Sequence, residues 1–369
     1  MRKKSLSSHA LTQKKSGRLA RILDSKEGHA VSRDGTRIYY KSVGRGLPIV
    51  LCNGMGVSTF FWKYFVNTFK NEFQVVIWDY RGHGHSDLPA HKDNISVEAL
   101  AEDCIAVCDA LKIKSAVFIG HSLGAQVGLE VYRKAPQRVA AYISCLGTFG
   151  RPMDFFYNFP LSKYIFELFT GISLAFPKQS RIFTQLLIRN PFWYELGGIL
   201  KVINTGMASR SDAQEYIDHF LKLETEFITQ LSRKMQAHSS EDVLKALKVP
   251  ALLIGGEYDT FTPAWLAKKM HRIIPDSELF IIKKGSHAAL VEQPELINLR
   301  IEKFIKERVL PFYHLSESAS SLAPKNSQKR TKSQARLKAP HAQKISSNKT
   351  LKSKTKGSKK SSKLKTSQR

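Results

Sequence analysis

Short apolar runs alternate with amphipathic stretches in two blocks of this 369-residue sequence. In the first block, residues 36–148, the runs are rich in Val and Ile and are mostly bounded by Gly, Pro or charged residues, which is typical of strands. The expected strands are 38–43, 48–52, 73–78, 115–119 and 139–144. Apolar side chains at helical spacing predict helices over 96–111 and 123–135. Strands that alternate with helices favour parallel pairing, so we expect an α/β fold with a mostly parallel central sheet and flanking helices.

The alternation returns in the second block. Strands are expected at 251–255 and 279–283, and helices at 263–274 and 294–308. Thr262 followed by Pro263 is typical of a helix start, because the hydroxyl can cap the first turn and proline needs no N–H there. The two blocks together predict a core made of residues 24–148 and 246–312.

The segment between the blocks, residues 149–245, has a different composition. Thirteen of the 52 residues in 149–200 are Phe, Tyr or Trp, against 10% aromatic residues in the whole chain. A helix is expected from about Ser211, which forms an S-x-x-Q capping box with Gln214, and helical spacing continues to Met235. We therefore predict an inserted helical cap. Its aromatic residues have three open interpretations: ordinary core, the lining of an acyl or aryl pocket, or contact with a membrane surface.

The net charge of +27 is concentrated at the two ends of the chain. Residues 1–23 carry seven Lys or Arg and no acidic residue, and residues 325–369 carry sixteen and none. Their composition predicts a basic disordered leader, 1–23, and a disordered Lys-rich tail, 315–369. The tail is interpreted either as a solvated segment or, through residues 325–369, as a binder of a polyanion such as nucleic acid or an anionic membrane.

The expected location is cytoplasmic. The leader has no apolar run of the kind that a secretory signal needs, although its composition also resembles an organellar transit peptide. No stretch reaches the roughly 18 uncharged apolar residues of a membrane-spanning helix. Four cysteines are too few for a disulfide scaffold, and Cys104 and Cys108 fall on the apolar face of a predicted helix as packing thiols. The oligomeric state stays open.

A nucleophile is predicted at Ser122, in the sequence Gly120-His121-Ser122-Leu123-Gly124. This G-x-S-x-G pattern follows a predicted strand and opens a predicted helix. A serine on such a sharp turn needs small neighbours, which the two glycines supply. The N–H of Leu123, at the start of the helix, can then face a developing oxyanion.

A serine needs a base to become a nucleophile, and the base needs an acid to orient it. His287 follows the second strand of the later block and is the predicted base. Asp259, just after the strand 251–255, is the predicted acid, and the order Ser122, Asp259, His287 suits this sheet topology. Glu257 lies two residues away, and Asp154 could serve as an acid placed after an earlier strand.

With these motifs the sequence resembles the α/β-hydrolase fold superfamily over roughly residues 30–310. Cys52-Asn53-Gly54-Met55-Gly56 is similar to the family's oxyanion loop, with Asn53 where His is usual, and implies that Met55 supplies a second oxyanion N–H. The D-x-R-G-x-G-x-S turn of the family is matched by Asp79-Tyr80-Arg81-Gly82-His83-Gly84-His85-Ser86. The resemblance implies a cap-bearing serine hydrolase. A serine at this turn argues against dehalogenases and epoxide hydrolases, which place Asp there, and against polyester synthases, which place Cys there.

The resemblance implies hydrolysis of an apolar carboxylic ester or lactone through an acyl-enzyme, with no cofactor and no metal. His83 and His85 could suggest a metal site, but without a matching cluster we interpret them as part of a satisfied turn. His121 is expected to pack beside the nucleophile. Two other functions stay open: acyl transfer or cofactor-free peroxidase chemistry on the same fold, and a nucleic-acid or polyanion-associated protein, docked by its tail, with secondary catalysis.

Overall fold

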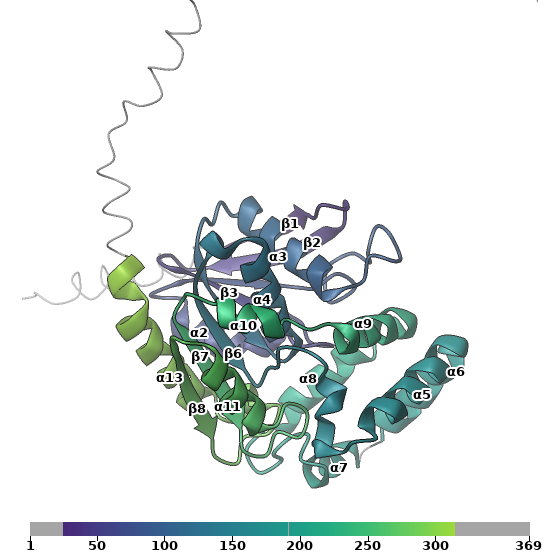
Figure 1. Cartoon of the computed structure of the whole chain (residues 1–369). Coiled ribbons are helices and arrows are strands. Elements are labelled where there is room, and N and C mark those ends of the chain that lie inside the picture. Colours follow the sequence, from purple (N-terminus) through teal and green to yellow (C-terminus); the bar gives the residue numbers. More distant parts are fainter. Residues whose placement is uncertain (1–24, 191, 314–369) are drawn as a thin grey trace, which may run out of the picture. The chain divides into compact units, whose positions relative to one another are not determined.

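The computed structural model describes residues 25–190 and 192–313, and its centre is an eight-stranded sheet (Figure 1). The strand order is β1-β2-β4-β3-β5-β6-β7-β8. β1 pairs with β2 and β2 with β4 in antiparallel fashion, whereas every pair from β4 to β8 is parallel. The strands are β1 (Ser25–Val31), β2 (Arg37–Val43), β3 (Pro48–Cys52), β4 (Gln74–Trp78), β5 (Ala116–His121), β6 (Val139–Cys145), β7 (Ala251–Gly256) and β8 (Ser277–Ile282). The predicted α/β fold with a mostly parallel sheet is confirmed.

The seven expected strands lie within two residues of their predicted bounds, and β1 is the strand that the sequence did not predict. β1 lies at the edge of the sheet, and Ala30 is its one buried residue. A strand that buries one side chain shows no apolar alternation, because its stability comes from its hydrogen bonds to β2.

Helices cover both faces of the sheet and create two apolar cores. One core joins β-strand residues to α3 (Val97–Ala110), α4 (Leu123–Lys134), α10 (Glu241–Ala246) and α11 (Ala264–Ile273). The other joins the opposite strand faces to α2 (Lys63–Phe69), α12 (Ala289–Glu292) and α13 (Pro294–Arg308). The 3-10 turns η2 (Thr59–Trp62) and η3 (Pro136–Arg138) connect these elements. Cys104 and Cys108 are buried and unpaired within α3, as packing thiols should be.

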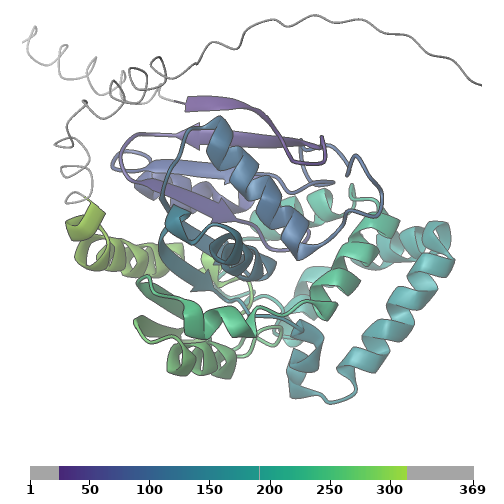
Figure 2. The same cartoon turned by 45° about the horizontal axis from the view of Figure 1, so that its top comes forward.

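Residues 149–245, here named the cap segment, connect β6 to β7 through a series of helices (Figure 2). They are η4 (Pro152–Asp154), η5 (Phe156–Asn158), α5 (Ser162–Ala175), α6 (Pro177–Ile188), α7 (Trp193–Ile199), α8 (Arg210–Phe220) and α9 (Thr225–Ala237), followed by α10, which packs in the first core. The remaining described residues, 25–148 and 246–313, are named the sheet region.

The single helix expected from Ser211 to Met235 is wrong, because the chain breaks it between α8 and α9. The helix starts within one residue of the expected position, at Arg210, but the expected capping box is wrong: Ser209 caps α8 by accepting a hydrogen bond from the Asp212 N–H, and Gln214 bonds Asp218 instead of closing a box with Ser211. Apolar spacing continues across residues 221–224, so periodicity alone could not reveal the break.

The predicted leader, 1–23, and the predicted tail, 315–369, lie outside the described residues. Within 25–190 and 192–313, no helix has both the length and the apolar composition needed to cross a membrane.

Candidate active site

Ser122 occupies the sharp turn between β5 and α4. Its φ of 54° and ψ of −116° lie outside the usual regions for a residue with a side chain, which is the strain expected of a nucleophile turn. The flanking glycines are required by space. A Cβ on Gly120 would lie 2.2 Å from the Gly124 carbonyl oxygen, and one on Gly124 would lie 2.1 Å from the Cys52 carbonyl oxygen. The turn can therefore exist only with glycine at both positions.

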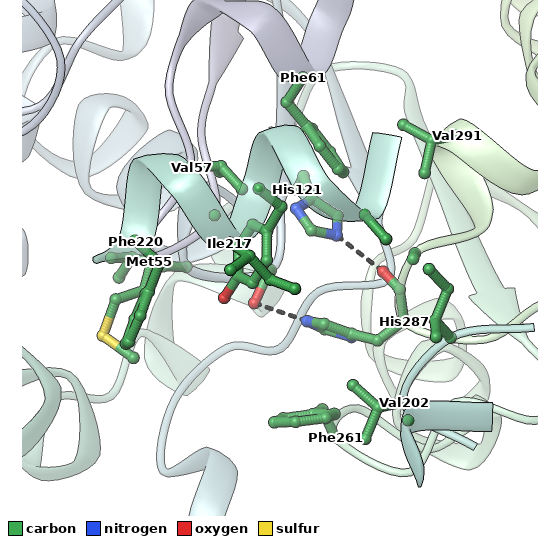
Figure 3. A pocket seen from close by; sticks show the side chains of 18 of the residues that line it. Met55, Val57, Phe61, His121, Val202, Ile217, Phe220, Phe261, His287 and Val291 are labelled. Carbon is green, nitrogen blue, oxygen red and sulfur yellow. Dashed lines mark hydrogen bonds between the residues drawn. The ribbon is translucent and has the colours of Figure 1, made fainter. Parts of the chain in front are cut away.

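The structure brings Ser122, His287 and Asp259 together from three loops at the ends of β5, β8 and β7. His287 Nε2 lies 3.0 Å from Ser122 Oγ, and His287 Nδ1 lies 2.9 Å from Asp259 Oδ2. The serine hydroxyl thus donates to the ring, and the other ring nitrogen donates to the carboxylate. The imidazole contacts Phe261 on one side and His121 on the other (Figure 3). The ring is held in one orientation by packing as well as by hydrogen bonds.

The Asp259 carboxylate is completely buried, and backbone and side-chain donors hold it in place. Its Oδ1 accepts hydrogen bonds from the N–H groups of Phe261 and Thr262, both at 2.9 Å. Its Oδ2 accepts from the Thr262 hydroxyl at 2.8 Å. The prediction that Thr262 caps a helix is therefore wrong: α11 begins at Ala264 without a side-chain cap, and the hydroxyl instead bonds Asp259 and the Leu146 carbonyl.

The two alternative acids have other partners. Glu257 is exposed and accepts a hydrogen bond from the Lys284 N–H, and Asp154 accepts one from Gln236 in the cap segment. Of the three candidate carboxylates, the one that meets His287 is Asp259.

The loop after β3 that carries Met55 is fixed on both sides. The Asn53 side chain accepts from Trp62 Nε1 and donates to the Trp78 carbonyl, both at 2.7 Å, and the Tyr80 hydroxyl donates to the Asn53 carbonyl. Met55 lines the same cavity as Ser122 and Leu123. Leu123 is the first residue of α4, so its N–H has no helical partner and is free to donate to a bound group.

His83 supports this loop from the D-x-R-G-x-G-x-S turn. Its Nε2 accepts a hydrogen bond from the Gly56 N–H at 3.2 Å, next to Met55. Burial lowers the pKa of His83 to about 4, so the ring is neutral and can accept this bond. The His85 side chain is exposed, and the backbone N–H of His85 donates a hydrogen bond to the Asp79 carboxylate. No group of three His, Cys, Asp or Glu in the described residues has the spacing of a metal site.

His121 does more than pack beside Ser122. Its Nε2 lies 3.0 Å from the His287 carbonyl oxygen, so the ring connects the His287 loop to the turn of Ser122. Burial, and secondarily the neighbouring His287, lower the pKa of His121 to about 3. A neutral His121 donates this bond without adding a charge beside His287. The sequence identified the position of His121 but not this bond.

A cavity of about 390 Å³ is lined by Ser122 and by side chains from both the sheet region and the cap segment. Figure 3 shows part of this lining, including Met55, Phe261 and His287. Apolar side chains from both regions line it, among them Met55, Phe61, Ile188, Trp193, Ile217 and Phe220. Such a lining suits an apolar organic group beside Ser122.

Gln126 is a polar residue of this cavity that the sequence interpretation missed. Its Oε1 bonds His238 Nδ1 at 2.8 Å, and His238 Nε2 in turn bonds Glu130 at 2.9 Å. The side chain is completely buried, yet its Nε2 has no partner among the described residues. Gln126 lies one helical turn after Ser122 and so on the same face of α4, the one signal in the sequence that could have identified it.

Comparison with known proteins agrees with this architecture. The sequence model of the alpha/beta hydrolase fold matches residues 48–294. The non-heme chloroperoxidase of Streptomyces lividans is 28% identical over 302 residues, covering 76% of this chain and 99% of that protein. Bifunctional epoxide hydrolase 2 of Sus scrofa is 24% identical over 299 residues, covering 73% of this chain, which spans about half (53%) of that longer protein.

Among solved structures, a thermophilic esterase from Thermogutta terrifontis superposes with a TM-score of 0.62 at 22% identity, covering 77% of this chain and 99% of that one. The three similar proteins share a fold, and their names describe three different reactions. The substrate must therefore be argued from the site itself.

Proposed function

Because the chain belongs to the α/β-hydrolase family, we propose that it is a serine hydrolase that cleaves an apolar carboxylic ester or lactone through an acyl-enzyme. The observation that carries the proposal is the hydrogen-bonded series Ser122, His287, Asp259, with its distances of 3.0 and 2.9 Å. A serine distinguishes this site from an epoxide hydrolase, whose reaction needs a carboxylate at the same turn. No cofactor or metal takes part in the proposed reaction.

In the first half of the reaction, Ser122 Oγ attacks the carbonyl carbon while His287 Nε2 takes its proton. Asp259 holds the ring and stabilises the imidazolium. The carbonyl oxygen gains negative charge and accepts hydrogen bonds from the N–H groups of Met55 and Leu123. The imidazolium then returns its proton to the departing alkoxide, and an acyl-Ser122 ester remains.

In the second half, His287 takes a proton from water, and the resulting hydroxide attacks the acyl carbon. The tetrahedral species collapses to a carboxylic acid and the Ser122 hydroxyl, which regains its proton from His287. The apolar lining from Met55, Phe61 and Trp193 favours an alkyl or aryl group over a charged one.

The test is fluorophosphonate labelling of Ser122→Ala, with Ser211→Ala, an exposed serine on α8, as the matched control. We expect Ser122→Ala to lose labelling and p-nitrophenyl ester hydrolysis, and Ser211→Ala to keep both. A chain-length series of p-nitrophenyl esters and lactones then defines the acyl preference. Labelling that persists in Ser122→Ala would remove this serine from the mechanism.

The identity of 28% with a non-heme chloroperoxidase favours a second candidate on the same residues. Here the acyl-enzyme transfers its acyl group to a non-water acceptor, such as an alcohol or hydrogen peroxide. Product analysis with added alcohol or peroxide separates the two functions: a carboxylic acid as the sole product supports hydrolysis, and a new ester or a peracid supports transfer.

A further inference from the structure

The apolar side chains of the cap segment are unusually exposed. Eighteen of the twenty-six large apolar side chains that lie exposed among the described residues fall between Tyr157 and Met207. On α6 they are Ile182, Phe183, Leu186 and Leu187, with exposed fractions from 46% to 73%. Contiguous apolar patches on a protein surface mark an interaction site.

Helix α5 packs on the protein through its polar face and exposes its apolar face, the opposite of an ordinary amphipathic surface helix. Its face toward α9 carries small polar side chains: the Ser173 hydroxyl bonds the Thr229 hydroxyl at 2.9 Å, and Thr170 is buried. Its other face carries the exposed large side chains Tyr164, Ile165, Leu168, Phe169 and Ile172. These five recur at helical spacing, so they form one stripe. A helix that turns its apolar stripe outward needs an apolar surface outside the protein.

Helix α6 repeats this arrangement. Its four exposed apolar side chains recur at i, i+1, i+4 and i+5 and so share one face. α6 packs against both α5 and α9, and Figures 1 and 2 show α5 and α6 on the side of α9 away from the sheet. The outer faces of α5 and α6, named here the outer patch, are thus available to a partner.

Cations accompany the outer patch. Between Tyr157 and Met207 the sequence has five Lys or Arg and two acidic residues. Lys178, Arg181 and Arg189 on and after α6 are exposed and form no ion pair with another described residue. An apolar face with unpaired basic side chains is the composition of a helix that lies in the interface of an anionic membrane.

We propose that the outer patch docks the protein on an anionic phospholipid bilayer, with the apolar side chains of α5 and α6 inserted among the acyl chains. Charge favours a bilayer over a second copy of the chain, because two outer patches, each from a segment with five Lys or Arg and two acidic residues, repel one another, whereas an anionic surface attracts them. The inner side of the same segment contributes Ile188, Trp193 and Tyr194 to the cavity above Ser122, so the docked surface lies beside the cavity. The docking does not depend on the proposed catalysis.

The test is cosedimentation of the full chain with vesicles of phosphatidylcholine containing 30% phosphatidylglycerol, against vesicles of phosphatidylcholine alone. We expect binding to the anionic vesicles, with a fraction that persists in 0.5 M NaCl, because apolar insertion is not screened by salt. A tail that binds through charge alone loses its contribution at that salt concentration.

The decisive variant is Phe183→Glu/Leu186→Glu, whose two side chains are 65% and 73% exposed and contribute little to packing. Its matched control is Leu299→Glu, a 66% exposed leucine on α13. We expect the double variant to lose at least tenfold in vesicle affinity and the control to bind like the unaltered chain, with equal melting temperatures. Lys178→Gln/Arg181→Gln/Arg189→Gln should weaken binding at low salt more than Lys26→Gln/Lys92→Gln/Lys114→Gln does.

Three results would overturn the proposal. The first is absence of vesicle binding by the unaltered chain, and the second is equal binding by Phe183→Glu/Leu186→Glu and Leu299→Glu. The third, read by light scattering without lipid, is a dimer that becomes a monomer in the double variant, which would assign the outer patch to a second copy.

Discussion

The sheet region buries its large apolar side chains and an arginine ion pair, whereas the cap segment exposes side chains of the same kinds. In the sheet region, large side chains such as Trp78 and Tyr142 are completely buried, and the one fully buried guanidinium, that of Arg81, meets two carboxylates. In the cap segment, leucines and phenylalanines face outward and the pair Arg210–Glu195 lies at the surface. The sheet region therefore holds polar side chains at fixed positions, whereas the cap segment exposes apolar side chains at its surface.

The two regions contribute different kinds of side chain to the candidate active site. Ser122, Asp259 and His287 all come from the sheet region, where buried donors and close glycine contacts position them. The cap segment contributes mainly apolar side chains to the cavity wall. Substitutions of buried polar residues in the sheet region should accordingly change rate or stability strongly, and matched substitutions of residues in the cap segment should change them less.

The largest difference is expected between two aspartates. Asp259→Asn should lower kcat for ester hydrolysis by about 10⁴-fold, because an amide cannot stabilise the imidazolium and favours the wrong ring tautomer. Asp154→Asn, in the cap segment, should change kcat by less than about twofold, because Asp154 bonds Gln236 and not His287. Steady-state kinetics on a p-nitrophenyl ester measures both. Equal losses in the two variants would contradict the assigned acid.

The next difference concerns buried and exposed arginines. Arg81 is 1% exposed, and it bonds Asp103 through Nε and Nη2 at 2.7 and 2.6 Å and Asp34 at 2.9 Å. Arg81→Met leaves the Asp103 carboxylate buried without its partner, which should lower the free energy of unfolding by about 3–5 kcal/mol. Arg210→Gln breaks an exposed pair in the cap segment and should leave the unfolding midpoint unchanged. Urea denaturation of both variants tests this.

Lowering the pH should reduce the free energy of unfolding more through His83 than through His219. Burial lowers the pKa of His83 from 6.5 to about 4, so the unfolded chain takes up the proton first as the pH falls. The folded state is therefore weakened between pH 6.5 and pH 4, by about 3 kcal/mol at 1.36 kcal/mol per unit, and no further below that. His83→Gln keeps an acceptor for the Gly56 N–H but does not titrate, so its stability should fall less over the same range.

His219 in the cap segment is the comparison for His83. Burial also lowers the pKa of His219, but this ring is less enclosed and lies beside His83. His219→Gln should therefore change the slope of stability against pH less than His83→Gln. Urea denaturation at pH 7 and pH 4.5 gives the slope of stability against pH for both variants. If His219→Gln changed this slope more than His83→Gln did, His219 and not His83 would be the main source of the loss of stability at low pH.

Local patterns in the sequence predicted the sheet region well, because its elements follow simple periods. Buried parallel strands are apolar runs, and loops at their carboxyl ends meet at one edge, so the motifs around Ser122, Asp259 and His287 could be placed together. β1 escaped prediction because it buries Ala30 alone. Thr262 was misassigned because its hydroxyl can serve a helix or a carboxylate equally well, and tertiary structure makes that choice.

The cap segment was less predictable because the apolar pattern of its helices does not indicate which of their faces is buried. An apolar period normally indicates the face that packs on the protein, yet α5 packs through Ser173 and Thr170. Gln126 shows the same difficulty inside the cavity. Its partner His238 is 112 residues away, and no local pattern connects them.

The smallest expected effect lies where the two regions meet, at Gln126 of α4 and His238 beyond α9. The buried Gln126 Nε2 has no partner among the described residues, so it is placed to donate to a polar atom of the substrate. Gln126→Leu should lower kcat/KM about tenfold for an ester with a carbonyl or hydroxyl in its acyl chain, because a buried polar group then loses its hydrogen bond. Esters with unsubstituted alkyl chains should change by less than about twofold. Gln214→Leu, an exposed glutamine of α8, is the control. An equal loss for both kinds of ester would contradict this prediction. It would mean that Gln126 acts only by supporting the position of His238 in the cap segment, and that the Gln126 Nε2 does not bond a polar atom of the substrate.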